Sequence, residues 1–365
     1  MTDFEKFKMS DNHFWKNKRV LITGHTGFKG SWLTLWLNYL GSSICGFSKD
    51  DDNDGFNLFN LLNISSKIEH HVDDISNSRK LSKIVEGFKP NIIFHLAAQP
   101  LVRKSYKEPF LTWSTNVMGT LNILEATRNL RNKCVIIIIT SDKVYKNKNW
   151  LYGYREEDEL GGHDPYSSSK AACELLTNSW RLSYCGEKHN QKQNLFVATA
   201  RAGNVIGGGD WAEDRIIPDL IKSLLGQNEL LIRNPKATRP WQHVLDPLSG
   251  YLTLAEKLFN SDNDLHTKSY NFGPPKTSNK SVEDLISHAI KYLPNKVKVN
   301  YSKSDLYEAS LLNLNIDLAH HELGWKPKWD FNKSVYRTIN WYKLFFYDKN
   351  DAKELCLSDI KEFLK

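Results

Sequence analysis

Residues 19–30 read RVLITGHTGFKG, a short apolar run that leads into a glycine-rich turn. The run at 19–23 predicts a buried strand, and the segment 29–40 predicts a helix that Gly41 closes. Glycines placed where a strand ends and a helix begins let the backbone approach a pyrophosphate, which the N–H groups of the helix terminus bind. This stretch therefore predicts a dinucleotide-binding unit whose loop holds the cofactor through Gly24, Thr26, Gly27, Phe28, Lys29 and Gly30.

The same alternation of strand and helix continues over the first 200 residues. Segments of helical period, at 77–88 and 166–184, separate apolar, β-branched runs. Further strands are predicted at 43–47, 67–72, 91–96, 134–140 and 194–201. Strands that alternate with helices form a parallel sheet covered on both faces. We therefore predict an α/β fold with a doubly wound, mainly parallel Rossmann sheet of seven strands.

The pattern changes after residue 201, where loops rich in Gly, Pro, Trp and charged residues replace the regular alternation. Helices are predicted here at 216–225, 247–259, 281–292 and 333–346. We predict that residues 1–203 form the nucleotide-binding domain, to which segments 241–259 and 270–272 return. A second, smaller α/β domain, expected to bind the substrate, takes residues 204–240 and 273–365.

Composition and charge exclude several classes of protein. The 365 residues are 40% hydrophobic and 25% charged, the balance of a soluble globular protein and not of a disordered or fibrous one. The uncharged stretch 30–48 contains Ser, Thr, Asn and Gly41, which favours a helix followed by a strand over a membrane span. Residues 1–8 carry four charges and no apolar block, unlike a signal peptide. We expect a cytoplasmic protein that does not contact a membrane.

Cysteine and histidine give no sign of a disulfide framework or a metal site. The five cysteines are scattered without a CxxC pair, which fits thiols in a reducing compartment. None of the twelve histidines forms an HxH or HxxxH pair, so we expect no bound metal. The net charge of +7 suits an anionic ligand, but no basic stripe with interleaved aromatics predicts nucleic-acid binding.

Tyr166 and Lys170 stand one turn apart at the start of the predicted helix 166–184. An ammonium close to a phenol lowers the pKa of the phenol and makes it a usable general base near neutral pH. Ser141, at the end of the strand 134–140, supplies a hydroxyl that can assist the phenol across a cleft. We therefore expect Tyr166, Lys170 and Ser141 to form a catalytic group.

The second and third strands bear on which dinucleotide binds. An NAD site usually carries an acidic residue at the tip of its second strand to hold the ribose hydroxyls, whereas Ser48 stands there in this chain. Ser48 and Lys49 would admit the 2′-phosphate of NADP, while Asp50 would repel it. Asp74 and Ile75, after the third strand, are expected beside the adenine. We expect NAD, with NADP left as an alternative.

Several blocks of sequence together resemble the extended short-chain dehydrogenase/reductases, the NAD-dependent epimerase/dehydratase family. They are the glycine loop, the strand end Leu96-Ala97-Ala98, Asn116, and the set Ser141, Tyr166 and Lys170. Within that family the blocks 140–145, 164–170, 201–211 and 239–244 are most similar to nucleotide-sugar dehydratases that act on CDP-glucose. The resemblance implies that NAD also contacts Leu96, Ala97, Ala98, Asn116, Tyr166 and Lys170.

The resemblance also implies a reaction. Tyr166 would remove the proton of the glucose 4-hydroxyl while a hydride passes from C4 to NAD. Water would then leave across C5 and C6, and the hydride would return to C6. The product would be CDP-4-keto-6-deoxyglucose, used for deoxysugars of surface polysaccharides. Asp142 and Lys143 directly follow Ser141, where relatives acting on dTDP-glucose carry Asp-Glu, and would serve as the acid for the 6-hydroxyl and the base for the C5 proton.

The diphosphate of such a substrate requires cations and hydrogen-bond donors, which the chain offers after residue 203. The residues expected to bind the nucleotide sugar are Asn204, Arg215, Arg233, Arg239 and His243. The resemblance further implies a homodimer or homotetramer, paired through the helix that bears Tyr166.

Three alternative functions stay open. One is a nucleotide-sugar 4-epimerase, although such an enzyme needs no second acid and base like Asp142 and Lys143. Another is a dehydratase for dTDP- or GDP-sugars. The last is a non-catalytic nucleotide-sensing or RNA-binding member of the fold, against which the intact Ser141, Tyr166 and Lys170 argue.

Overall fold

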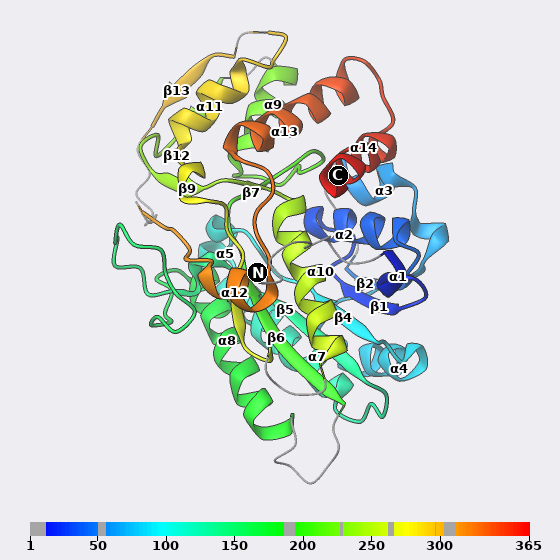
Figure 1. Cartoon of the computed structure of the whole chain (residues 1–365). Coiled ribbons are helices and arrows are strands. Elements are labelled where there is room, and N and C mark those ends of the chain that lie inside the picture. Colours follow the sequence, from blue (N-terminus) through cyan, green and yellow to red (C-terminus); the bar gives the residue numbers. More distant parts are fainter. Residues whose placement is uncertain are drawn as a thin grey trace, which may run out of the picture.

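Seven parallel strands form one sheet through the middle of the molecule (Figure 1). The computed structural model describes residues 12–49, 56–185, 194–226, 229–261, 266–295, 297–302 and 311–365. In spatial order the strands are β11 (Ser269–Asn271), β6 (Leu195–Arg201), β5 (Cys134–Ile139), β4 (Ile92–His95), β1 (Arg19–Thr23), β2 (Ser43–Ser48) and β3 (Glu69–Val72). Every pairing within this sheet is parallel, so the predicted Rossmann sheet is confirmed.

β1 lies inside the sheet because its apolar run is paired on both sides. Val20 is in register with Ile44 of β2 and with Ile92 of β4. The strand order runs outward from β1 to β3 in one direction and from β4 to β6 in the other. Parallel sheets bind ligands beyond the carboxyl ends of their strands at such a reversal, which places the predicted glycine loop at the ligand site.

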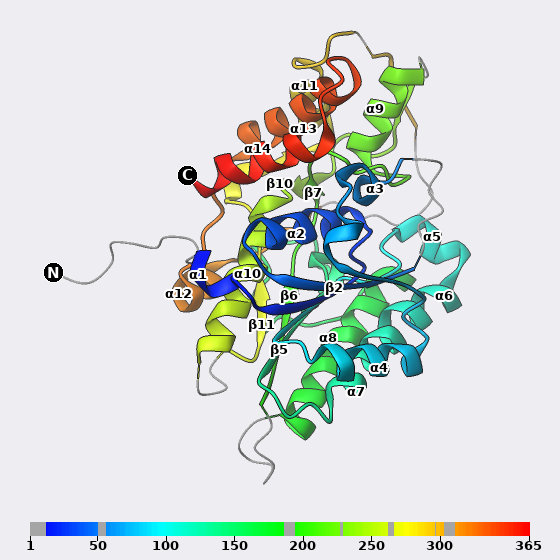
Figure 2. The ribbon, with the colours of Figure 1, turned by 90° about the vertical axis from the view of Figure 1, so that its right-hand side faces the viewer.

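Helices cover both faces of the sheet (Figure 2). On one face lie α2 (Phe28–Tyr39) and α10 (Leu245–Asn260), and on the other lie α4 (Ser78–Phe88), α7 (Gly119–Thr127) and α8 (Pro165–Tyr184). Successive residues of a strand point to opposite faces. Val20 therefore belongs to the same core as Trp32 of α2, whereas Leu21 belongs with Leu81 of α4 to a second core. Burial on both faces explains why these strands are continuous apolar runs.

Helix α8 begins where the sequence carries a capping signal. The Asp164 side chain accepts a hydrogen bond from the backbone N–H of Ser167 at 2.9 Å, and Pro165 takes the first helical position. The backbone N–H of Tyr166 donates to the Ser105 hydroxyl at 3.1 Å. These contacts fix the first turn of α8, and with it the place of the predicted base.

Small sheets and helices form the upper part of the molecule as drawn in Figure 1, and short helices and turns connect the other elements. Two-stranded sheets pair β7 (Val205–Ile206) with β10 (Gln242–His243), β9 (Thr238–Pro240) with β12 (Asn279–Ser281), and β8 (Leu230–Ile232) with β13 (Val299–Tyr301). The upper helices are α9 (Ile216–Gly226), α11 (Val282–Ile290) and α13 (Phe331–Phe346). Further helices are α1 (Asn12–Trp15), α3 (Leu58–Leu62), α5 (Val102–Lys107), α6 (Pro109–Trp113), α12 (Asp317–Leu323) and α14 (Ala352–Leu364). The short turns are η1 (Ser65–Lys67), the π-helical η2 (Ser114–Met118), η3 (Asp142–Val144) and η4 (Lys276–Ser278).

The structure refines two boundaries expected from sequence. The strand expected at 67–72 begins only at Glu69, because the residues before it form the turn η1. α14 belongs to the predicted substrate domain, yet it packs on α2, where the rings of Trp36 and Phe363 lie 5.8 Å apart. The division into two domains therefore stays a prediction. None of the described helices is both long and apolar enough to span a membrane.

Candidate active site

A cleft of about 1360 Å³ opens at the carboxyl ends of the strands. The loops that follow β1, β2, β4, β5 and β6 contribute to its wall, as in other parallel sheets. Most residues predicted for the site line it: Gly24, Thr26, Gly27, Phe28, Lys29, Gly30, Ser48, Asp74, Ile75, Leu96, Ala97, Ala98, Ser141, Lys143, Tyr166, Lys170, Asn204, Arg215, Arg233 and Arg239. Asn116, Asp142 and His243 lie behind this wall or away from it.

The glycine loop brings backbone segments into close contact. Gly24 has φ of +73°, and a Cβ atom on it would lie 2.7 Å from the amide nitrogen of Ala97. A Cβ atom on Gly30 would lie 2.1 Å from the carbonyl oxygen of Gly24. At Gly27, by contrast, a Cβ atom would meet only that same oxygen, at 3.5 Å. The fold itself therefore requires glycine at 24 and 30, whereas the space beside Gly27 belongs to the cleft and fits a pyrophosphate.

The end of β2 forms one corner of the cleft. The hydroxyl groups of Ser48 and Thr26 are hydrogen-bonded at 2.7 Å, and Lys49 also lines the wall. Asp50, expected to repel a 2′-phosphate, lies outside the described residues. Asp74 and Ile75 stand in the same corner. The corner thus fits the adenosine half of a dinucleotide.

Tyr166 and Lys170 are both buried in the first turns of α8. Burial raises the pKa of Tyr166 to about 12, while a hydrogen bond with Ser141 acts in the opposite direction. Burial also lowers the pKa of Lys170, whose ammonium donates to the carbonyl oxygen of Ile139 at 3.1 Å. The predicted lowering of the Tyr166 pKa is therefore wrong for this chain, because burial raises that pKa more than the hydrogen bond with Ser141 lowers it.

Asp142 is completely buried directly behind the cleft wall. Its Oδ1 accepts a hydrogen bond from the Ser141 hydroxyl at 3.0 Å and lies 3.3 Å from Nζ of Lys143. Its Oδ2 accepts from the amide Nδ2 of Asn204 at 3.0 Å. Three donors therefore surround this carboxylate, and two of them, Ser141 and Lys143, come from the loop that continues β5. Asn204, predicted to bind substrate, lines the cleft but gives its amide to Asp142.

The arginines expected at a diphosphate differ in their partners. Nη1 of Arg215 lies 3.0 and 2.9 Å from the two carboxylate oxygens of Asp210. Nη1 of Arg233 donates to Asp214 at 2.7 Å. Within the described parts of the chain, no acidic side chain pairs with Arg239, which is 7% exposed and faces the cleft. Arg239 is thus the buried guanidinium whose charge remains available to an anionic ligand.

Positive charge collects around Lys29 in the middle of the cleft. Burial, together with the charges of Arg215, Lys170 and Lys143, lowers the pKa of Lys29 to about 7, and Asp142 acts in the opposite direction. Cations gathered in a partly buried wall repel one another, and an anion between them relieves that repulsion. The electrostatics of the cleft therefore fit a polyphosphate ligand.

The structure corrects the placement of two predicted residues. His243 is buried with its ring 5.8 Å from that of Trp32 and 4.7 Å from that of Trp329, and burial lowers its pKa to about 3. It is a core residue because β10 turns it inward, away from the cleft. The Asn116 side chain accepts a hydrogen bond from the backbone N–H of Gln99 at 2.8 Å and donates to a hydroxyl of α8. Asn116 thus holds the loop after β4 against α8, behind the wall.

Sequence reasoning missed an aromatic pair in the cleft wall. The rings of Phe56 and Trp211 stack at 4.4 Å with an angle of 28° between their planes. Phe56 follows an acidic run in the sequence, which predicts a plain surface loop. The one available signal was a large aromatic residue at the edge of that polar segment. Glu174 was also missed, although it stands one turn after Lys170 on the same helix.

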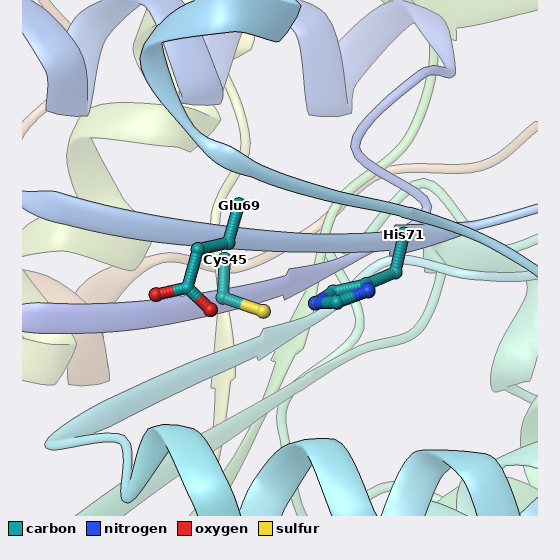
Figure 3. Close-up of side chains that lie close together, drawn as sticks. All are labelled: Cys45, Glu69 and His71. Atoms are coloured by element: carbon teal, nitrogen blue, oxygen red, sulfur yellow. The ribbon is translucent and has the colours of Figure 1, made fainter.

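One group of potential metal ligands lies apart from the cleft. Among the described residues, Cys45 of β2 and Glu69 and His71 of β3 bring one ligand atom each within 4.8 Å of the others (Figure 3). Burial, with Glu69 as a second cause, raises the pKa of the Cys45 thiol to about 12. A thiol that keeps its proton is a poor metal ligand. We therefore assign this group no part in the site, and the expected absence of a metal stays a prediction.

Comparison with known proteins places the chain in a family. The family model described as GDP-mannose 4,6 dehydratase matches residues 21–338, a range that includes every residue of the cleft wall. The chain belongs to that family. Among curated members of known activity, the CDP-glucose 4,6-dehydratase of Salmonella typhimurium is 42% identical over 92% of this chain and 93% of its own length. The resemblance predicted from the sequence blocks is confirmed.

Solved structures share the fold of this family member. An epimerase from Methanothermobacter thermautotrophicus has a TM-score of 0.80 at 22% identity, over 98% of this chain and 99% of its own. The dTDP-glucose 4,6-dehydratase of Bacillus anthracis, solved in complex with NAD, has a TM-score of 0.74 at 20% identity, over 91% and 99% of the two chains. At these identities the likeness establishes the fold alone.

Proposed function

We propose that this chain acts as a CDP-glucose 4,6-dehydratase with NAD as its cofactor. One observation carries the proposal: the cleft that holds Tyr166 and Lys170 also presents Lys143, whose Nζ lies 3.3 Å from the buried carboxylate of Asp142. Oxidation at C4 needs a single base, whereas loss of water needs a second acid and base. The 42% identity to the Salmonella typhimurium enzyme supports CDP-glucose as the substrate.

The cleft fits NAD through features of this chain. The space beside Gly27 would be filled by a Cβ atom, the N-terminus of α2 points its N–H groups there, and the corner at Ser48 and Asp74 suits the adenosine. Ser48 is tied to Thr26, which favours NAD because a 2′-phosphate would have to displace that contact. When bound, NAD would supply the redox chemistry: it would accept the hydride from C4 and would later donate it to C6.

Tyr166 begins the proposed reaction by taking the proton of the sugar 4-hydroxyl. Its hydrogen bond with Ser141 favours the phenolate, and the ammonium of Lys170 holds positive charge nearby on the same helix. Burial of the phenol raises its pKa to about 12, but it also excludes water from the reacting atoms. The product keeps the ketone at C4, so Tyr166 gives this proton to solvent before the next turnover, while Asp142 regains one proton from solvent.

Asp142 and Lys143 carry the proposed elimination. Lys143 lines the cleft and is the proposed base that removes the C5 proton. Asp142 supplies the proton for the departing 6-hydroxyl. Because the carboxyl group lies behind the wall, this proton passes through the Ser141 hydroxyl, which is 3.0 Å from Oδ1 of Asp142 and lines the cleft. One C–H and one C–O bond break, a C5–C6 double bond forms, and water leaves. When this double bond is reduced at C6, Lys143 returns the proton to C5.

Arg239 is the proposed anchor of the substrate diphosphate, supported by Lys29 and Arg215. Among the described residues, no acidic side chain pairs with Arg239 and would have to be displaced, whereas Arg215 and Arg233 are already bonded to Asp210 and Asp214. The proposed product, CDP-4-keto-6-deoxyglucose, is a precursor of deoxysugars for surface polysaccharides. A cytoplasmic location follows from this proposal, because nucleotide sugars and NAD are cytoplasmic substrates.

We further propose that the enzyme is a homodimer or homotetramer paired through α8. Large apolar side chains are exposed on α8 and on the adjacent α6 and η2: Phe110, Trp113, Met118, Leu175 and Leu182. A monomer rarely exposes so many on neighbouring elements, and a second copy of the same face would bury them. Light scattering of the purified protein tests this assembly.

The test of the proposed function is a set of incubations with NAD and CDP-, dTDP-, UDP- or GDP-glucose, followed by mass spectrometry. We expect a product lighter by one water from CDP-glucose only. The matched control is Tyr166→Phe, in which turnover should fall at least about a hundredfold. Conversion without a change in mass would support the epimerase instead, and loss of water from another nucleotide sugar would reassign the base.

A further inference from the structure

Glu174 is a buried carboxylate that the proposed chemistry does not use. It lies on α8 one turn after Lys170 and is 2% exposed. Its Oε1 accepts a hydrogen bond from the Thr140 hydroxyl, and its Oε2 accepts from the hydroxyl of Thr199 at 2.7 Å and from Nη2 of Arg201 at 2.9 Å. One side chain therefore connects the helix that bears the catalytic pair with the residue that follows β5 and with strand β6.

Arg201 extends this connection on the other side. It is 3% exposed, and its Nη1 donates to the hydroxyl of Tyr145 and to the carbonyl oxygen of Glu156, both at 2.8 Å. Burial alone would raise the pKa of Glu174, but the charge and hydrogen bonds of Arg201 reverse this and hold the pKa below its usual value. Both partners thus stay charged in the interior.

In the sequence, residues that this pair contacts lie on either side of the proposed acid and base. Thr140 directly precedes Ser141, and Tyr145 is two residues after Lys143. Arg201 itself stands three residues before Asn204, whose amide donates to Asp142. Hydrogen bonds and chain segments therefore form a closed ring. It runs from Glu174 on α8 to Thr140, along the loop to Asp142, across to Asn204, and back along the chain to Arg201 and the ion pair.

We propose that Glu174 and Arg201 are positioning residues that set the distance between the catalytic pair on α8 and the loop 141–145. Neither side chain lines the cleft, so they act through Thr140, Tyr145 and the backbone of β6. The proposed reaction takes place at C4, C5 and C6 of one bound sugar, so both sets of groups must reach the same substrate. Small displacements of catalytic groups cost large factors in rate. The proposal rests on the proposed function only for its kinetic readout.

A purely structural role makes a different prediction. Buried ion pairs are often no more stabilising than apolar residues of similar size. A second ion pair, Arg337 of α13 and Asp359 of α14, has side chains 17% and 7% exposed, lies away from the cleft wall and serves as a control. If burial of charge were all that mattered, replacing either pair with apolar residues would have the same consequences.

The test compares Glu174→Gln, the double variant Glu174→Leu with Arg201→Met, and the control Arg337→Met with Asp359→Leu. For the first two we expect kcat for CDP-glucose to fall between about tenfold and a hundredfold, with KM and NAD affinity near those of the wild type. Backbone amides of 140–145 should exchange with deuterium faster. The control should change thermal stability alone. The double variant addresses folding, because it removes both charges of the pair together and leaves neither partner alone.

Two results would overturn the proposal. One is a folded double variant with wild-type kcat, and the other is unchanged hydrogen exchange of 140–145 in Glu174→Gln. If the wild type itself does not act on CDP-glucose, the proposed function fails, but the exchange measurement still decides whether this ion pair positions the loop. The two failures are therefore distinguishable.

Discussion

A Cβ atom on Gly203 would lie 2.0 Å from Cγ of Asp142, so the carboxylate occupies space that only glycine leaves open. Gly203→Ala should push Asp142 away from Ser141 and Lys143 and lower kcat for loss of water by about a hundredfold, as expected for a displaced catalytic group. NAD affinity should not change. Steady-state kinetics and calorimetric titration with NAD measure the two effects.

Gly87→Ala is the control for this substitution, because a Cβ atom there meets nothing within 4 Å and the residue lies in α4. It should leave kcat unchanged and raise thermal stability slightly, since alanine loses less backbone entropy in a helix. Wild-type turnover in Gly203→Ala would show that Asp142 need not occupy its observed position.

Gly27 and Gly30 should respond differently to alanine. The space beside Gly27 holds no close protein atom, so Gly27→Ala should fold normally and weaken NAD binding at least about tenfold. Gly30→Ala forces a Cβ atom to within 2.1 Å of the carbonyl oxygen of Gly24 and should reduce the melting temperature sharply. Calorimetric titration and thermal melts separate the two. An NAD affinity unchanged in Gly27→Ala would remove the main support for the pyrophosphate site.

Arg239 should contribute to binding more than to the chemical step. A diphosphate is held equally in the substrate and in the transition state, so Arg239→Ala should raise KM for CDP-glucose about tenfold or more and alter kcat little. Arg233→Ala should have a smaller effect, because Arg233 is partly exposed and already bonded to Asp214. A loss confined to kcat in Arg239→Ala would contradict the assignment.

Glu156 should make stability depend on pH. Burial raises its pKa to about 7 in the folded chain, above the 4.5 of an ordinary Glu. The folded state therefore binds more protons than the unfolded state between these values, and the contribution of Glu156 to stability falls as pH rises toward 7. Glu156→Gln should be more stable than the wild type at pH 8, by about 3 kcal/mol at most, with no gain near pH 4.

Glu159→Gln is the control for this pH dependence, because Glu159 is an exposed carboxylate paired with Lys146, and its pKa is lowered. Chemical denaturation of both variants at several pH values provides the measurement. An equal difference between Glu156→Gln and the wild type at pH 4 and pH 8 would rule out titration of Glu156 as the cause.

Local sequence was sufficient to predict most of the sheet and the glycine loop. Strand 19–23 matches β1 to the residue, because an apolar run buried on both faces has no competing structure. The pair Tyr166 and Lys170 was found because helical spacing brings them to one face. The turn η1 shortened the expected third strand, since β3 is a polar edge strand with little apolar pattern to define it.

Contacts distant in sequence could not be predicted in the same way. The sequence around His243 does not indicate that Trp32 and Trp329 pack against it. The structure therefore places in the core a residue that the sequence predicted to bind substrate. The burial that raises the Tyr166 pKa likewise depends on the packed fold and not on the four-residue spacing to Lys170. Glu174 and Arg201 are 27 residues apart, and only the sheet brings them together.

The most direct test of the proposed dehydratase follows one isotope through a turnover. CDP-glucose labelled with deuterium at C4 is incubated with the enzyme and NAD, and the product is analysed by mass spectrometry and NMR. The account predicts a product that has lost one water and carries the deuterium in its C6 methyl group. Two results would contradict it. One is a product of unchanged mass with the deuterium still at C4, and the other is deuterium recovered in free NADH and not in the sugar.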